Sequence, residues 1–170
     1  MSSFPGRTRQ SAPGRPPPRA LLCLLLACLG LTASAAEPAL DLARWRGKVV
    51  LVDFWASWCV PCRQSFPWLN EMQAKYGARG LVVIGVNVDR ERAEAERFLQ
   101  QTPADFPILY DPEGSLAARY EVPGMPSSYV FGPDGELVAR HIGFRKAARE
   151  EREAQLTRLL PVAAAKAPTP

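Results

Sequence analysis

The sequence predicts an α/β fold in which a central mixed sheet of about five strands carries helices on both faces. In the first half of the chain, apolar β-branched segments alternate with segments of helical periodicity, which is typical of parallel strands joined by crossover helices. In the second half, two strand-like segments flank the sequence Gly132-Pro133-Asp134-Gly135, which favours a tight antiparallel turn. Parallel and antiparallel pairing together make the predicted sheet mixed.

Apolar patterning predicts the elements of the first half in order. A turn of helix at Asp41–Trp45 precedes a continuous apolar run, broken only by Asp53, which predicts a buried strand over Val49–Trp55. Helical spacing of apolar residues predicts a helix over Pro61–Tyr76, which Pro67 should kink. A second β-branched strand is expected over Leu81–Val88 and a charged helix over Arg90–Gln101.

The elements of the second half are shorter. The sequence predicts a strand over Pro107–Tyr110, a helix over Gly114–Tyr120, strands over Ser128–Phe131 and Leu137–Ile142, and a final helix over Ala147–Leu160. Residues 161–170 are rich in Ala, Pro and Lys, a composition that favours disorder. We therefore expect one folded domain over residues 37–160 and a disordered tail over residues 161–170.

Residues 1–36 have the layout of a secretory signal peptide. A basic, Pro-rich start is followed by an apolar run from Ala20 to Leu31 and then by small residues up to Ala36. We expect cleavage near Ala35 or Ala36 and a periplasmic protein. Two alternatives remain open: an uncleaved membrane anchor, and lipidation at Cys28, because the sequence before that cysteine resembles a bacterial lipobox.

The charge balance argues against polyanionic partners. The chain holds 21 Lys and Arg against 17 Asp and Glu, but residues 1–36 contain four arginines and no acidic residue. The remainder of the chain is therefore neutral. Because nucleic acids and acidic membrane surfaces require a clustered positive field, we exclude both as partners. We expect a monomer.

Cys59 and Cys62 are the only cysteines outside residues 1–36. A disulfide across two intervening residues closes almost no loop, so it is better explained by chemistry than by stability. Cys59 lies after a predicted strand and at the start of a helix, whose N-terminus stabilises a thiolate, so its pKa should lie below the roughly 8.5 of a free cysteine. We expect Cys59 to attack a partner disulfide and the more buried Cys62 to resolve the mixed disulfide, with no cofactor besides this redox-active pair.

Asp53 is a carboxylate within a predicted buried strand. Burial should raise its pKa and allow it to take the proton of Cys62 as that thiol attacks the mixed disulfide. The alternative is that Asp53 points outward or caps a turn.

The segment from Val52 to Cys62, VDFWASWCVPC, resembles the active-site segment of the thioredoxin superfamily, and the similarity extends over about residues 37–160. Its FWASWC sequence, together with the FGPDG sequence that starts at Phe131, is most similar to the TlpA-type periplasmic proteins. The resemblance implies a thioredoxin-like fold, a cis peptide bond before Pro126, and hydrogen bonding of an incoming peptide by the backbone of Met125. Trp58, next to Cys59, is expected to line the partner-binding surface.

This resemblance also implies the direction of electron transfer between the cysteine pair and its substrate. TlpA-type proteins are usually reducing, so we expect a reductase of protein disulfides, such as those of apocytochromes, that is recharged by a membrane electron donor of the DsbD type. An oxidase or isomerase and a non-catalytic binding module are the alternatives. Metal binding is not expected, because a structural zinc site needs four ligands and the domain offers two cysteines and His141, which we interpret as a surface or core residue.

Overall fold

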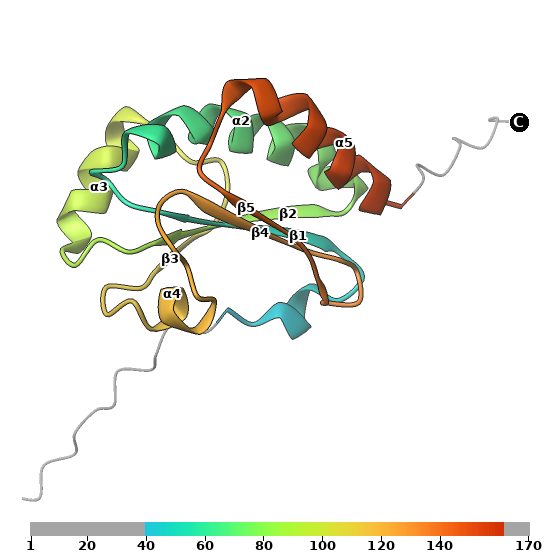
Figure 1. Ribbon diagram of the computed structural model, residues 1–170, viewed down its shortest axis with the longest axis horizontal. Coiled ribbons are helices and arrows are strands. Elements are labelled where there is room, and N and C mark those ends of the chain that lie inside the picture. The colour runs from blue at the N-terminus through green and yellow to red at the C-terminus, as the bar shows by residue number, and fades with distance from the viewer. Residues whose placement is uncertain (1–39, 162–170) are drawn as a thin grey trace, which may run out of the picture. The chain divides into compact units, whose positions relative to one another are not determined.

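The computed structural model describes residues 40–161, which form one five-stranded mixed sheet with helices on both faces, as the sequence predicts (Figure 1). The strand order is β3-β2-β1-β4-β5. Strands β1 (Val49–Trp55), β2 (Leu81–Asn87) and β3 (Ile108–Tyr110) are parallel to one another. Strands β4 (Ser127–Phe131) and β5 (Leu137–Ile142) form an antiparallel hairpin, and β4 pairs with β1. The central strand β1 is therefore hydrogen-bonded on both sides.

One face of the sheet is covered by α2 (Val60–Tyr76), α3 (Arg92–Gln101) and α5 (Arg149–Leu159). Alternate residues of β1 point to this face, and Leu51 and Trp55 pack in its core with Phe66 of α2, Phe98 of α3 and Leu156 of α5. The position of Asp53 between two core residues on this face explains why the carboxylate is buried.

The other face is covered by α4 (Ser115–Arg119) and by the 3₁₀ helix η1 (Leu42–Trp45). Here the intervening residues of β1, including Val52 and Phe54, pack with Leu116 of α4 and Tyr129 of β4. Residues along β1 point alternately to the two faces of the sheet and fill two separate cores, which is why the strand is apolar apart from Asp53.

Most predicted boundaries differ from the observed ones by one or two residues. Helix α2 begins at Val60, with Cys59 as its N-cap residue, and continues through Pro67. Helix α3 begins at Arg92, where Arg90 was predicted, because Asp89 lies in the loop after β2 and is held by side-chain hydrogen bonds. The predicted final helix is divided into a 3₁₀ turn, η3 (Lys146–Ala148), and α5. A further 3₁₀ turn, η2 (Gly77–Arg79), follows α2.

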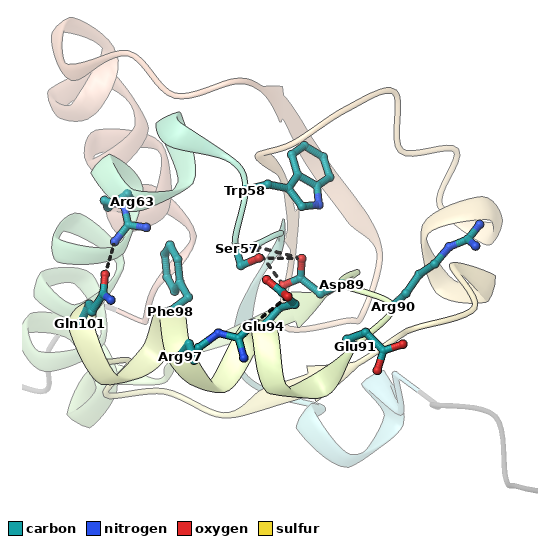
Figure 2. Close-up of a pocket in the computed structure, with 10 residues that line it drawn as sticks. All are labelled: Ser57, Trp58, Arg63, Asp89, Arg90, Glu91, Glu94, Arg97, Phe98 and Gln101. Carbon is teal, nitrogen blue, oxygen red and sulfur yellow. Dashed lines mark hydrogen bonds and ion pairs between the residues drawn. The ribbon is translucent and has the colours of Figure 1, made fainter.

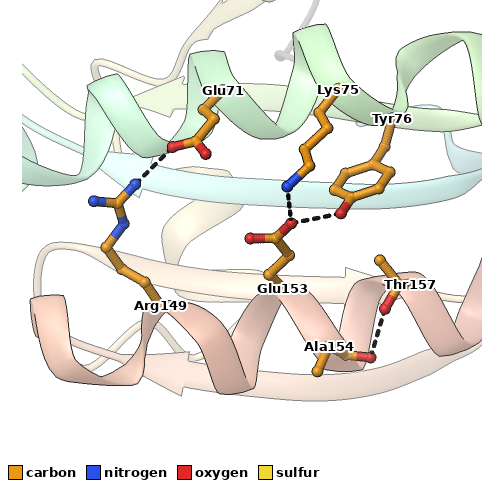
Figure 3. Close-up of polar contacts among 7 residues, drawn as sticks. All are labelled: Glu71, Lys75, Tyr76, Arg149, Glu153, Ala154 and Thr157. Carbon is orange, nitrogen blue, oxygen red and sulfur yellow. Dashed lines mark hydrogen bonds and ion pairs between the residues drawn. The ribbon is translucent and has the colours of Figure 1, made fainter.

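Polar side chains of α5 contact those of α2 through ion pairs and hydrogen bonds (Figure 3). Arg149 forms an ion pair with Glu71 at 2.6 Å, and Glu153 accepts hydrogen bonds from both Lys75 and Tyr76. These contacts fix the register of α5 against α2 and so determine which α5 residues face the sheet.

The predicted signal peptide (1–36) and all but the first residue of the predicted tail (161–170) lie outside the described residues. Between residues 40 and 161, none of the helices has the length and apolar character needed to cross a membrane.

Candidate active site

Cys59 and Cys62 form a disulfide at the N-terminus of α2, just beyond the carboxyl end of β1. Their Cα atoms are 5.3 Å apart, and the amide of Cys62 donates a hydrogen bond to Sγ of Cys59 at 3.2 Å. Cys59 is 4% exposed and Cys62 is 0% exposed. The pair is therefore asymmetric: Cys59 keeps a small exposed fraction and Cys62 none, and the N-cap position of Cys59 places it where the helix N-terminus favours negative charge.

Asp53 lies on the face of β1 that α2 and α5 cover, and its side chain is 1% exposed. The alternative of an outward-facing Asp53 is therefore wrong. Ser128 of β4 donates its hydroxyl to Oδ1 of Asp53 at 2.6 Å, whereas Oδ2 is buried with no hydrogen-bond partner in the described structure. Burial raises the pKa of Asp53 from 3.8 to about 7, against the opposing effects of the Ser128 hydrogen bond and the charge of Arg152.

A hydrogen-bonded bracket holds the loop before Cys59, and sequence reasoning missed it. The carboxylate of Asp89, in the loop after β2, accepts hydrogen bonds from the Ser57 amide at 2.9 Å and the Ser57 hydroxyl at 3.0 Å (Figure 2). The side chain of Asn87 donates to the same carboxylate at 2.7 Å. Asp89 is itself buried, whereas Ser57 is half-buried, and both residues line a surface groove. The bracket fixes the backbone two residues ahead of the reactive sulfur.

Trp58 is 69% exposed and borders a surface groove of about 500 Å³ (Figure 2). The far wall is the start of α3 with its charged side chains, including Glu94 and Arg97, which form an ion pair at 2.6 Å. Arg63 of α2 stacks over the ring of Phe98, with 4.8 Å between the guanidinium carbon and the ring centroid. By contrast, Trp55 is fully buried, as expected for a core residue.

The Met125–Pro126 peptide bond is cis. Met125 is partly buried, and Ser127, which follows Pro126, pairs with Phe54 of β1, so this loop lies at the same end of the sheet as the disulfide. The Pro126 carbonyl accepts a hydrogen bond from the Gly143 amide at 2.7 Å, and the Ser127 hydroxyl donates to the Gly124 carbonyl at 2.7 Å. These contacts hold the loop from both ends.

All six residues predicted for the site thus lie at one end of the sheet or directly beneath it: Asp53, Trp58, Cys59, Cys62, Met125 and Pro126. The sequence offered no signal for Ser128, Arg152 or Asp89, since their contacts depend on strand register and helix packing. Within residues 40–161, no group of three or more His, Cys, Asp and Glu side chains is arranged to hold a metal ion.

This fold and its CxxC pair, together with the relatives described next, define a thiol-disulfide oxidoreductase of the thioredoxin superfamily, of the TlpA type. The chain is similar to the thiol-disulfide oxidoreductase ResA of Bacillus cereus, with 30% identity over 122 residues that cover 72% of this chain and 69% of the relative. A family model described as Redoxin matches residues 28–157. The chain therefore belongs to the Redoxin family.

Solved structures agree with this assignment. A crystal structure described as that of a thiol:disulfide interchange protein DsbE, from Chlorobium tepidum, matches with 47% identity and a TM-score of 0.68, covering 69% of this chain and 84% of that one. The exposed lipoprotein thioredoxin Etrx1 from Streptococcus pneumoniae matches with 29% identity and a TM-score of 0.60, covering 69% and 90% of the two chains.

Proposed function

We propose that the protein is an exported reductase of protein disulfides that acts through Cys59 and Cys62, with Asp53 as the proton acceptor for Cys62. The observation that carries the division of roles is the asymmetry of the pair. Cys59 keeps a small exposed fraction, whereas Cys62 is fully buried on the side of the sheet where Asp53 lies. An external disulfide can meet Cys59 alone.

The reaction then has two exchange steps. The Cys59 thiolate attacks a substrate disulfide, which forms a mixed disulfide and releases one substrate thiolate. Cys62 transfers its proton to Asp53 and attacks Sγ of Cys59, which closes the Cys59–Cys62 disulfide and releases the second substrate thiolate. The substrate gains two electrons, and the two released thiolates take protons from the solvent. No cofactor besides the dithiol is required.

The surface around Cys59 suits a polypeptide substrate. The exposed indole of Trp58 offers apolar area at the residue next to Cys59, and the Met125–Pro126 loop lies at the same end of the sheet as the disulfide. In the proposed complex the backbone of Met125 pairs with the incoming peptide. We propose that the substrates are proteins with reducible disulfides, including apocytochromes whose haem-binding cysteines are joined in a disulfide.

Reducing activity outside the cytoplasm needs a supply of electrons, because that compartment is oxidising. We therefore place the protein, as a monomer, in the periplasm after cleavage of residues 1–36, with a membrane electron donor of the DsbD type. The name of the Streptococcus relative, an exposed lipoprotein, supports export of the fold. A protein that is lipidated within residues 1–36, or anchored in the membrane by them, would keep the same active site.

A glutathione titration of the Cys59–Cys62 pair tests whether the protein acts as a reductase or as an oxidase. A reductase predicts a reduction potential near that of thioredoxin, about −270 mV, and an oxidase predicts a value near that of DsbA, about −120 mV. A value near the latter would overturn the reductase proposal in favour of an oxidase. Cys59→Ala, which has no redox pair, is the control. It should abolish peptide reduction, whereas a non-catalytic binding module would retain its function.

A further inference from the structure

A polar row crosses three strands beneath the active site. The backbone register places Asp53 of β1 opposite Ser128 of β4, and Ser128 opposite His141 of β5. Directly opposed side chains of antiparallel strands have Cβ atoms about 4.5–5.5 Å apart. The Ser128 hydroxyl is hydrogen-bonded to Asp53. On the other side of Asp53 the register continues to Gly85 and Ile108, which carry no polar side chain, so polar groups lead only towards β5.

His141 lies between the protein interior and the surface. With Ser128 and Arg152, it lines a narrow gap whose remaining walls are side chains of the core. It also lines an open surface pocket of about 360 Å³, together with Arg145 and Glu151. The half-buried imidazole is thus the side chain of the row that reaches solvent.

The reaction requires Asp53 to exchange its proton with solvent. A group with a pKa of about 7 is protonated in about half of the molecules at neutral pH. In those molecules Asp53 cannot accept the proton of Cys62 until it has released its own. A docked polypeptide covers the surface at Cys59, so the proton of Asp53 needs a second exit, a route to solvent elsewhere. We propose that Ser128 and His141 form this exit, a proton relay that joins Asp53 to the surface pocket beside α5; the proposal rests on the role of Asp53 given above.

The chemistry of the groups along the row favours His141 as the outer member. Its Nε2 lies 2.8 Å from Oε1 of Gln155. Because an amide oxygen only accepts hydrogen bonds, Nε2 carries the hydrogen and Nδ1 of the neutral ring is left as a proton acceptor. An imidazole can accept a proton at one ring nitrogen and release one from the other, whereas the guanidinium of Arg152 has no acceptor atom and cannot relay.

Arg152 has a different part in this region. Its Nη2 donates to the Gly143 carbonyl at 2.9 Å, and its Nη1 is buried without a hydrogen-bond partner in the described structure. Its charge opposes the effect of burial on the pKa of Asp53. The charged groups around the row are therefore Arg152 at its inner part, and Arg145 and Glu151 in the pocket at its outer end.

Single-turnover reduction of a disulfide-linked peptide, measured against pH, tests the relay. His141→Gln keeps a hydrogen-bonding side chain but cannot relay a proton. We expect it to lower the rate about tenfold below about pH 7, less than the 10²–10⁴-fold typical of direct acid–base catalysis. The deficit should vanish above about pH 8, where Asp53 has already lost its proton. Arg145→Ala, in the same pocket but outside the row, should behave as the wild type.

Chemical rescue separates relay from structure. Imidazole added to His141→Ala should restore the rate in a concentration-dependent way, because the surface pocket is open to it. Ser128→Ala should show the same pH-dependent loss without rescue, since Ser128 is buried. A wild-type rate in both His141 variants, or a loss that is independent of pH and insensitive to imidazole, would overturn the relay. If Asp53→Asn matches the wild type at every pH, the proposed role of Asp53 fails instead.

Discussion

Asp53 makes the stability of the oxidised protein depend on pH in a direction opposite to that of most carboxylates. Its pKa rises from 3.8 in the unfolded chain to about 7 in the folded protein, chiefly because of burial. The folded state therefore holds this proton more tightly than the unfolded state does. The associated stability is fully present below about pH 4 and is lost as the pH rises to about 7. The total loss is on the order of 4 kcal/mol, since each unit of pKa corresponds to about 1.4 kcal/mol.

Asp53→Asn removes this titration and keeps an oxygen that can accept the Ser128 hydroxyl. Urea unfolding of the disulfide form at several pH values should show a free-energy advantage of the variant over the wild type that grows from about pH 4 and levels off above about pH 7. Asp105→Asn, at an exposed position, is the matched control and should give a constant difference. A difference between Asp53→Asn and wild type that does not change with pH would refute this account of the buried carboxyl.

Two further substitutions test the surroundings of the cysteines. Asp89→Ala leaves the buried side-chain amide of Asn87 and the half-buried donors of Ser57 without their acceptor, and should cost about 1–3 kcal/mol of unfolding free energy by urea titration. Asp105→Ala should cost less than about 0.5 kcal/mol, and an equal cost for the two would show that the bracket contributes nothing. Trp58→Ala should leave stability within about 0.5 kcal/mol but raise the KM for a disulfide peptide several-fold. Leu137→Ala, equally a change to an exposed apolar residue, should leave KM unchanged, and identical KM values for the two variants would exclude Trp58 from the docking surface.

The central part of the fold could be predicted because local pattern and global burial coincide there. The run from Val49 to Trp55 is apolar on both faces because β1 is the central strand between two cores, and this pattern is visible in sequence. Asp53 could be identified from the sequence as a buried carboxylate because it interrupts this otherwise apolar run. The helical spacing of apolar residues predicted a helix from Pro61, one residue after the observed start of α2 at Val60.

The partners of Asp53 could not be predicted, because they depend on long-range register. Whether Ser127 or Ser128 faces Asp53 is decided by the pairing of β4 with β1, and a shift of one residue would turn Ser128 to the opposite face. Arg152 reaches this region only because α5 packs against α2 in a fixed register. His141 appeared in the sequence as an isolated histidine, and only the strand pairing places it in a row with the active site.

Trapping of a mixed disulfide tests the central claim, that Cys59 is the nucleophile and Cys62 the resolving thiol. The domain carrying Cys62→Ser, incubated with a disulfide-linked peptide, should accumulate a covalent adduct at Cys59, because the second exchange step is blocked. The wild-type domain should reduce the peptide and leave no adduct, and Cys59→Ser should form none. A stable adduct at Cys62 in the Cys59→Ser domain, or the absence of any adduct with Cys62→Ser, would contradict the account.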